Sequence, residues 1–560
     1  MRDVQLAERV YERSSDAADA VYCILLAFIL MGLVERIGYV SLRCRRMADG
    51  PSRSAGCLPP PDSLPRVCTQ LAMYNEAACA IRVIDAACSL NWPRDKHEIQ
   101  VLDDSTDPDV RAAVDACVNQ WQVRGVDCRV IRRERRTGFK AGALELGRHS
   151  TDATFLAMFD ADFVPAPDFL HQTIPHFYDD KGQLIKHLAL VQARWAHLNM
   201  SESLLTLAQS LWIDDHHISQ MVWRSSVWKF VNFTGTAGVW RAEAISVAGG
   251  WRASSLVEDC ELSFRTLFCG YETAFVPVDV PAELVGSVAA YKAQQRRWTL
   301  GWAQLIRLHL GSLLLRHKCS FIKRLHLTYH MLLSIQWPLW FAWQVITPCI
   351  ADYRAHVEPS HGAFLRFIFY ACPLAFHMIL ASAIVACERL ETVKQHTAWA
   401  RIPKPLVWCL LFLRVVPTAF LSAAMLPHQA CAWFEGILSH TAEFETTPKS
   451  GATDAVGTGQ VGSNAAGTTR ARTQRWYVVV EAAFVLYQLS WFCHFCGEGH
   501  YSLALGSSFP AFSVGCLWAS TCLSACASRI LTSVSRSHGA FPSWRAPTQL
   551  SNVGGEHLLA

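Results

Sequence analysis

Charged side chains are scarce in this sequence of 560 residues: Asp, Glu, Lys and Arg together make up 18% of it. The net charge of +4 is too small to indicate a nucleic-acid partner. Hydrophobic residues make up 51%, and the mean hydropathy is +0.16. This composition excludes a disordered chain and is too apolar for an ordinary soluble enzyme of this size, so it favours a membrane protein.

Several common site motifs are missing as well. The sequence has neither a GxxxxGK[ST] loop nor a GxGxxG fingerprint, so it supports neither a P-loop NTPase nor a dinucleotide enzyme. Although there are 21 cysteines, no paired CxxC…CxxC zinc spacing occurs. Cys493 and Cys496, with His500 nearby, form the only tight cluster, and they end an apolar run. Reduced cysteines of a membrane protein explain them better than a metal site does.

Long apolar runs bracket one polar block. After an N-terminal tail at 1–19, residues 20–42 predict a transmembrane helix of the length that a bilayer requires. The arginines that follow place that side in the cytosol by the positive-inside rule, and 43–65 is a proline-rich linker. The remaining predicted segments are the polar block at 66–300, an interfacial region at 301–324, membrane or interfacial helices at 325–449, a disordered loop at 450–475, two transmembrane helices at 476–527 and a disordered tail at 528–560.

One of these apolar segments, 405–426, carries a charge near its middle. Arg414 would be costly at the centre of a bilayer, and Pro417 follows it closely. We expect a bent, re-entrant or interfacial helix here, which would return the chain to the cytosol. The alternative is a full crossing in which Arg414 faces a polar channel.

Within the polar block, strand patterns alternate with helix patterns. Strands are predicted at 67–73, 98–102, 155–159 and 188–192, and helices at 76–90 and 109–122. This alternation predicts an α/β sheet wound largely in parallel. In such sheets, ligands bind at the carboxyl ends of the strands.

Acidic residues follow three of the predicted strands. Glu76 comes after the first, Asp103 and Asp104 end the second, and Asp160 and Asp162 end the third. Any one of them could be a helix cap or a turn residue. Together they would converge on one crevice, where close carboxylates favour Mg²⁺ or Mn²⁺ and, with it, a pyrophosphate-containing substrate.

Two further clusters fit such a site. Glu258 and Asp259 precede an amphipathic helical run, so capping is the alternative for Asp259. Gln294, Arg297 and Trp298 lie just before the later membrane segments, where a basic run could instead meet lipid headgroups. A guanidinium suits a pyrophosphate, and an indole face suits a sugar ring.

These motifs, in this order, resemble those of processive family 2 glycosyltransferases of the cellulose synthase superfamily. Longer strings resemble the cellulose synthase-like A and C branches over residues 20–345: QVLDDSTDP (100–108), GFKAGAL (138–144), FDADFVPAPDFL (159–170), LVQARW (190–195), GTAGVWR (235–241) and QQRRW (294–298). The resemblance implies a GT-A-type α/β glycosyltransferase domain at 66–300, inserted in a polytopic α-helical membrane domain.

The resemblance also implies residue roles. Asp259 would be the catalytic base, Asp160 and Asp162 would bind the metal, and Glu258 and Trp298 would contact the acceptor. Residues 444–449 resemble the gating loop of cellulose synthases. The donor nucleotide sugar would be held by Tyr74, Glu76, Asp103, Asp104, Lys140, Asp160, Gln294 and Arg297.

The function implied is that of an inverting, processive hexosyltransferase that extends a β-1,4-linked polysaccharide. Mannan or glucomannan from GDP-mannose is favoured over β-1,4-glucan from UDP-glucose, although the A-branch and C-branch motifs are mixed and Thr234 replaces a family Asn. A single-transfer enzyme acting on a lipid carrier and a transporter or scaffold with an inactive domain remain alternatives. The expected setting is a Golgi or plasma membrane, with the catalytic domain in the cytosol, the growing glycan and the bilayer as partners, and the oligomeric state open.

Overall fold

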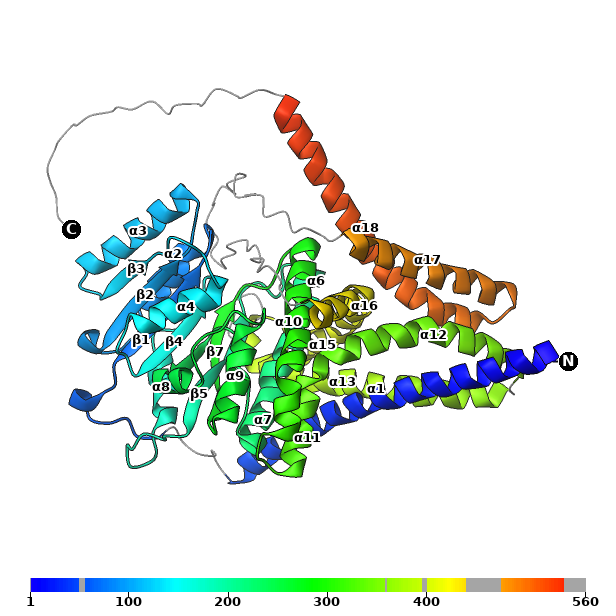
Figure 1. Ribbon diagram of the computed structural model, residues 1–560, viewed down its shortest axis with the longest axis horizontal. Coiled ribbons are helices and arrows are strands. Elements are labelled where there is room, and N and C mark those ends of the chain that lie inside the picture. The colour runs from blue at the N-terminus through cyan, green and yellow to red at the C-terminus, as the bar shows by residue number, and fades with distance from the viewer. Residues whose placement is uncertain (1, 50–55, 358–359, 395–399, 440–474, 538–560) are drawn as a thin grey trace.

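The computed structural model describes residues 2–49, 56–357, 360–394, 400–439 and 475–537. Figure 1 shows a sheet domain on one side of the molecule, from which long helices extend to the other side. The sheet has seven strands in the order β3-β2-β1-β4-β6-β5-β7. The predicted fold class, an α/β domain joined to a large helical region, is confirmed.

The first half of the sheet is parallel, as predicted. β1 (Val67–Met73) pairs with β2 (His97–Asp103) and β4 (Phe155–Asp160), and β2 pairs with β3 (Cys128–Ile131). The connecting helices are α2 (Ala80–Cys88), α3 (Pro108–Val123) and α4 (Phe139–His149). β1, β2 and β4 are nearly continuous buried runs because helices cover both faces of the sheet.

The second half of the sheet is mixed, which the sequence did not predict. β6 (Gly238–Arg241) runs antiparallel to β4 and to β5 (Leu188–His197), while β7 (Glu272–Ala282) is parallel to β5. β6 is only four residues long, and β7 contains Pro277 and Pro281. Proline is tolerated there because β7 is the edge strand, so its unpaired side needs no amide donor.

The core lies on both faces of the sheet. Alternate residues of β4 separate onto the two sides: Phe155 and Phe159 join one buried cluster, and Leu156 and Met158 join the other. Burying both faces fixes the strand register, because a slip by one residue would exchange the two sets. The carboxyl ends of β1, β2 and β4 are thereby held at one edge.

A series of helices links the sheet to the helical region. α10 runs without interruption through residue 300, so the domain boundary predicted there falls inside a helix. Its first turn is capped by Ser287, whose hydroxyl accepts from the Ala290 amide. The elements of this part are α5 (Phe169–Thr173), α6 (Leu204–Asp215), the π-helical turn η4 (His216–Gln220), α7 (Met221–Trp228), α8 (Ala242–Val247), α9 (Glu258–Phe268), α10 (Val288–Leu315) and α11 (Phe321–Met331).

The long helices beyond the sheet domain are strongly apolar. They are α1 (Arg2–Asp49), α12 (Gln336–Val357), α13 (Ser360–Lys394), α15 (Lys404–Leu413), α16 (Val415–Leu438), α17 (Arg475–Gly497) and α18 (Tyr501–Ser537). Within the described residues, five segments are long and apolar enough to cross a membrane: Asp16–Arg45, Cys372–Val393, Lys404–Leu438, Trp476–Gly497 and Tyr501–Leu523.

Three sequence-based boundaries differ from the helices observed. The region predicted as membrane or interfacial helices, 325–449, is interrupted near its start by the turn η5 (Leu333–Ile335), and within the described residues its first candidate span begins only at Cys372. α1 begins at Arg2, within the predicted tail, and α18 continues to Ser537, past residue 528. The gating-like loop at 444–449 and almost all of the loop at 450–475 lie outside the described residues.

The helix is interrupted at Arg414, where a bend was expected. α15 ends at Leu413 and α16 begins at Val415, and Pro417 lies in the first turn of α16, where a missing amide donor is tolerated. Arg414 is fully buried and donates to Ser210 Oγ at 2.8 Å and to Asp214 Oδ2 at 3.0 Å. The charge therefore lies against α6 rather than in lipid. Whether this segment crosses the bilayer stays a prediction.

Candidate active site

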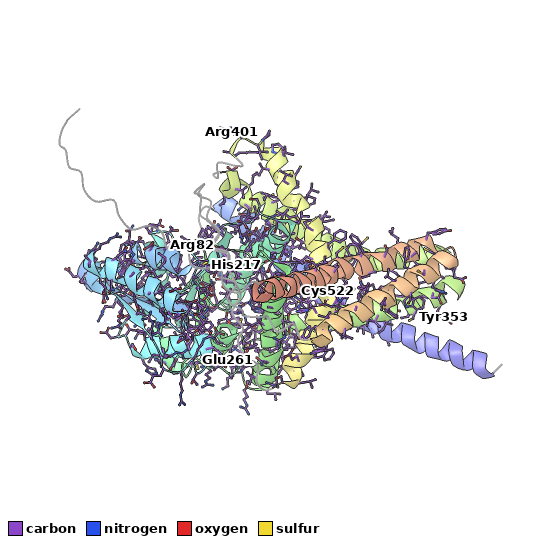
Figure 2. The ribbon with its side chains drawn as sticks, turned by 90° about the horizontal axis from the view of Figure 1, so that it is seen from above. Arg82, His217, Glu261, Tyr353, Arg401 and Cys522 are labelled. Atoms are coloured by element: carbon purple, nitrogen blue, oxygen red, sulfur yellow. The ribbon has the colours of Figure 1, made fainter. Side chains whose placement is uncertain are left out.

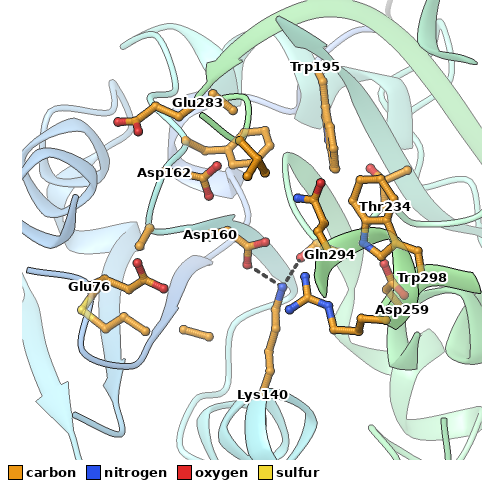
Figure 3. A pocket seen from close by; sticks show the side chains of 18 of the residues that line it. Glu76, Lys140, Asp160, Asp162, Trp195, Thr234, Asp259, Glu283, Gln294 and Trp298 are labelled. Carbon is orange, nitrogen blue, oxygen red and sulfur yellow. Dashed lines mark hydrogen bonds and ion pairs between the residues drawn. The ribbon is translucent and has the colours of Figure 1, made fainter. Parts of the chain in front are cut away.

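A pocket lies where the carboxyl ends of β1, β2 and β4 face α9 and α10 (Figure 3). It gathers residues that are far apart in the sequence, and all but one of the predicted site residues line it. Those lining residues are Tyr74, Glu76, Asp104, Lys140, Asp160, Asp162, Glu258, Asp259, Gln294, Arg297 and Trp298.

The loop after β1 fixes the first part of the pocket. Asn75 adopts a left-handed backbone (φ 54°), which asparagine tolerates, and its Oδ1 accepts from the amides of Thr106 at 2.9 Å and Asp107 at 3.0 Å. This links the loops that follow β1 and β2. Tyr74 next to it lies under the Arg136 guanidinium, 3.5 Å from the ring centre. A flat, partly charged surface of this kind suits a nucleobase.

The two neighbouring aspartates at the end of β2 have different surroundings. Asp104 lines the pocket and is held by Arg133, whose Nε donates at 2.9 Å. Asp103 is the exception among the predicted residues. It is buried, accepts from Arg132 Nε at 2.9 Å and from the Ser105 amide at 3.0 Å, and does not line the pocket. Its position corrects the prediction that Asp103 contacts the donor directly: it supports the strand end from behind.

The acids at the end of β4 lie beside a partly buried lysine. Lys140, from α4, donates to Asp160 Oδ1 at 2.5 Å and to the Gly235 carbonyl at 2.8 Å (Figure 3). Burial alone would lower the pKa of Lys140, but Asp160, Glu258 and Asp259 raise it above its ordinary value. Lys140 is therefore a fixed positive charge in a pocket of carboxylates.

The same acids provide hard oxygen ligands. No group of three or more His, Cys, Asp and Glu side chains among the described residues could hold a metal alone. Mg²⁺ and similar ions are commonly held by one or two carboxylates together with substrate phosphates. Asp160 and Asp162, two residues apart at the carboxyl end of β4, fit that arrangement.

Glu258 and Asp259 form the first turn of α9. The position before the helix is Val257, which makes no side-chain cap, and Asp259 lines the pocket. Its Oδ1 accepts from the Cys260 amide at 2.8 Å. Burial raises the pKa of Asp259, and burial together with Asp259 raises the pKa of Glu258 to about 7. Two adjacent carboxyls with raised pKa values form a proton-accepting site, which simple capping would not produce.

α10 presents one face to the pocket and the opposite face to the apolar helices α16 and α17. Gln294, Arg297 and Trp298 line the pocket, as expected for residues three and four apart on a helix. Burial lowers the pKa of Arg297, which the carboxylates around it oppose, and the guanidinium keeps its charge. The headgroup-binding alternative for this basic run does not fit residues that face inward.

Comparison with protein families agrees with this geometry. The model of Glycosyl transferase family group 2 matches residues 155–434, which is half of the chain. The chain belongs to this glycosyltransferase family. The model of Glycosyl transferase family 2 also matches, at residues 71–223. The family resemblance inferred from the motifs is confirmed.

Curated relatives of this glycosyltransferase are glucomannan synthases. Glucomannan 4-beta-mannosyltransferase 1 of Cyamopsis tetragonoloba is 38% identical over 292 residues, covering 51% of this chain and 55% of the relative. Probable glucomannan 4-beta-mannosyltransferase 3 of Arabidopsis thaliana is 40% identical over 270 residues, covering 48% of each. The chain thus spans about half the length of the curated relatives it matches.

Among solved structures, a mannosyltransferase of Pyrobaculum calidifontis in complex with GDP-Man and Mn²⁺ matches 70% of this chain and 97% of its own, with a TM-score of 0.40 and 18% identity.

Other lining residues of this glycosyltransferase pocket had no role predicted from sequence. Trp195 and His197 from β5, with Gln209 and Ile213 from α6, form what we call the β5–α6 wall. Thr234, noted in the sequence as a departure, also lines the pocket, and its amide donates to Gln192 Oε1 at 3.1 Å. The family string LVQARW ends at Trp195 and so indicated that residue. Neither periodicity nor spacing in the sequence indicated Gln209 or Ile213 of α6.

Proposed function

We propose that this chain is a membrane-embedded, inverting hexosyltransferase that extends a β-1,4-linked polysaccharide, with GDP-mannose as the favoured donor. The observation that carries the proposal is the pocket itself. It joins the carboxylates of three parallel strand ends to the Gln294, Arg297 and Trp298 face of α10. Sugar transfer from a nucleotide donor requires negative groups for a metal, positive groups for a diphosphate, and a base near an aromatic ring.

The diphosphate of the donor would lie against Asp160, Asp162, Lys140 and Arg297, which line the same pocket. These carboxylates would hold Mg²⁺ or Mn²⁺, which supplies positive charge against the departing phosphate oxygens. Lys140 and Arg297 lie in the same pocket and supply further positive charge where the leaving group develops its negative charge. Tyr74, beneath Arg136, would contact the base.

The acceptor would react from the side of α9. Its hydroxyl oxygen forms a bond to the anomeric carbon while the bond from that carbon to the diphosphate oxygen breaks. The bonding electron pair leaves with the nucleoside diphosphate, and the hydroxyl proton moves to the Asp259 carboxylate. Attack opposite the leaving group inverts the anomeric centre, so an α-linked donor gives a β-linkage. A raised pKa suits Asp259 to accept a proton near neutral pH.

The substrate assignment rests on the relatives. The relatives described above are named as glucomannan 4-beta-mannosyltransferases. Residues 136–138 (RTG) resemble the cellulose synthase-like C branch and so favour the alternative donor, UDP-glucose; Arg136 lies over Tyr74. Five apolar helices support a membrane setting with processive extension and translocation, as opposed to transfer of a single sugar to a lipid carrier. We place the protein in the Golgi or plasma membrane, with the pocket facing the cytosol.

Incubating purified protein in lipid nanodiscs with radiolabelled GDP-mannose or UDP-glucose tests this function. The expected product from GDP-mannose is an insoluble polymer that an endo-β-1,4-mannanase degrades. Polymer from UDP-glucose alone, degraded by a β-1,4-glucanase, would replace the mannan assignment. An organic-soluble product would indicate a lipid-carrier enzyme, and no product from either donor would contradict the proposed activity.

A further inference from the structure

Trp195 of the β5–α6 wall lies across the pocket from Lys140 (Figure 3). Trp195 stacks on the His217 ring, with centroids 5.1 Å apart and planes 24° apart, and meets Phe163 edge-on at 5.2 Å. His217 belongs to the π-helical turn η4, and Figure 2 shows it where the sheet domain meets the helices. This wall is therefore built at the junction of the two parts of the molecule.

A buried carboxylate directly behind the wall joins it to two membrane helices. Asp214, next to Ile213 on α6, is fully buried. Its Oδ1 lies 2.9 Å from His197 Nε2 and accepts from Arg389 Nη2 of α13 at 2.8 Å. Its Oδ2 accepts from Arg414 Nη1, at the α15–α16 junction, at 3.0 Å. One side chain of the sheet domain thus holds two membrane helices and one residue of the wall.

Arg389 also contacts the wall directly. Its Nη2 donates to the Trp195 carbonyl at 2.7 Å, and its Nη1 lies 3.2 Å from both Asp279 carboxylate oxygens. A single guanidinium from α13 therefore bridges β5, α6 and β7. The forked, planar group is required for this geometry, because an ammonium could not reach three acceptors on three elements at once.

The charges in this cluster are strongly coupled. Burial alone would raise the pKa of Asp214, but Arg389, His197 and Arg414 hold it well below its ordinary range, so it stays ionised. Removing one member of such a cluster leaves an uncompensated buried charge, which costs far more than the intact pair contributes. Apolar side chains could hold these helices together without that free-energy cost. The presence of buried ion pairs therefore indicates that the positions of these helices relative to the wall must be fixed.

We propose that Asp214 and Arg389 are positioning residues through which the membrane helices set the place of Trp195 and His197 for the saccharide acceptor. The donor side of the pocket is held by partners within the sheet domain, so the network controls acceptor binding and leaves donor binding nearly unchanged. This inference rests on the proposed function, because it assumes transfer to a saccharide.

A neighbouring ion pair provides a matched control. Asp215, the next residue on α6, is equally buried and pairs with Arg36 of α1. Its other hydrogen bonds go to Ser219 and Gln220 of η4 rather than to the β5–α6 wall. The Arg36 and Arg389 contacts therefore share burial and charge type, and they differ in whether they reach the pocket.

The test compares Arg389→Lys with Arg36→Lys in the full chain in nanodiscs. Three quantities are measured: the affinity for GDP, the rate of GDP-mannose hydrolysis without acceptor, and the KM for a β-1,4-linked manno-oligosaccharide acceptor. For Arg389→Lys we expect an acceptor KM raised about tenfold or more, with GDP affinity and hydrolysis within about twofold of wild type. For Arg36→Lys we expect a lower melting temperature without a change in acceptor KM.

Equal effects of Arg389→Lys and Arg36→Lys on acceptor KM, or a parallel loss of GDP affinity in Arg389→Lys, would overturn the proposal. If Arg389→Lys does not fold, the double variant Asp214→Asn/Arg414→Gln removes one buried charge pair while Arg389 keeps Asp279. It should bind GDP normally and still show a raised acceptor KM; an unchanged KM would overturn the proposal. If the wild-type chain transfers no sugar from either donor, the proposed function is contradicted, and this inference fails with it. If the wild-type chain does transfer sugar, the variants test this inference alone.

Discussion

The strand-end side of the pocket and its helix side are held together in different ways. On the strand-end side, which includes Tyr74, Asp104 and Asp160, the supporting partners come from the sheet domain: Arg133 binds Asp104, and Lys140 binds Asp160. On the helix side, comprising the β5–α6 wall and α10, further partners come from the long apolar helices: Arg389 of α13 contacts the wall, and α16 and α17 contact α10. The strand-end side is therefore complete within one domain, while the helix side is not.

α10 shows the dependence of the helix side most directly. Its face opposite the pocket carries Lys292, which donates to Glu481 of α17 at 2.7 Å, and Gln295, to which Gln429 of α16 donates at 3.1 Å. Arg296, next to Arg297, pairs with Glu435 of α16 at 2.5 Å. Polar contacts in apolar surroundings fix the rotation of α10, because any other rotation would bury these groups unpaired.

This difference suggests a division of tasks, in which the strand-end side binds the donor and the helix side binds the acceptor. Under the proposed function, a nucleotide sugar is a small, constant ligand that a rigid sheet edge can hold, whereas a growing glycan would have to move as it is extended. Placing the second task on elements tied to membrane helices would let those helices influence acceptor position. The following predictions test that division, from the largest expected effect to the smallest.

Asp259 lies between the two sides, and replacing it should have the largest effect. Asp259→Asn keeps the shape of the side chain but removes the proton acceptor, so turnover should fall by about 10²–10⁴-fold. GDP affinity should stay near that of wild type. Steady-state kinetics and calorimetric GDP titration check this result, and wild-type-like turnover in the purified variant would refute the assignment of the base.

Asp162→Ala should disable the strand-end side alone. It removes an oxygen ligand where the diphosphate charge must be neutralised, so kcat should fall by about 10²–10³-fold and stimulation by Mg²⁺ or Mn²⁺ should be lost. The acceptor KM of the residual activity should change little. A metal titration of the purified variant provides the measurement. Full metal-stimulated activity would mean that Asp162 only shapes the end of the strand.

Trp298→Ala should disturb the helix side with a smaller effect. The indole covers apolar C–H surface of a sugar ring, and losing that contact should raise the acceptor KM by about tenfold, which corresponds to about 1.4 kcal/mol. Arg297→Ala should instead weaken GDP binding. Acceptor kinetics and GDP titrations of both variants separate the two roles. Equal losses of GDP affinity in the two variants would contradict the assignment of Arg297 to the diphosphate and of Trp298 to the acceptor.

The smallest expected effect is a shift in pH dependence. Glu258 has a pKa raised to about 7, and it lies next to the proposed base. Because the base must be deprotonated, kcat/KM should rise with pH as the pair loses its proton near pH 7. Glu258→Gln removes the carboxyl whose pKa is about 7, so the acidic limb should move to lower pH and be set by Asp259 alone. Rate profiles between about pH 5.5 and 8.5 measure this, and an unmoved limb would contradict the coupling.

Sequence patterns predicted the strand-end side well. The runs at 67–73, 98–102 and 155–159 match β1, β2 and β4 closely, so the strand pattern alone was enough to bring together the acids that follow them. The error there was Asp103, because two adjacent strand-end residues point to opposite sides and the pattern does not say which one faces the pocket. The short β6 and the proline-containing β7 were missed because neither has a normal strand pattern.

By itself the sequence determined the α/β class, the apolar helical region and the convergence of acids at one sheet edge. Each of these follows from local periodicity and from the rule that parallel strands end together. Only the tertiary structure decided what holds the β5–α6 wall and where the Arg414 charge goes. Arg389 and Arg414 meet Asp214 across 175 and 200 residues. No local pattern encodes such a contact, because it depends on how separately formed helices pack around one buried carboxylate.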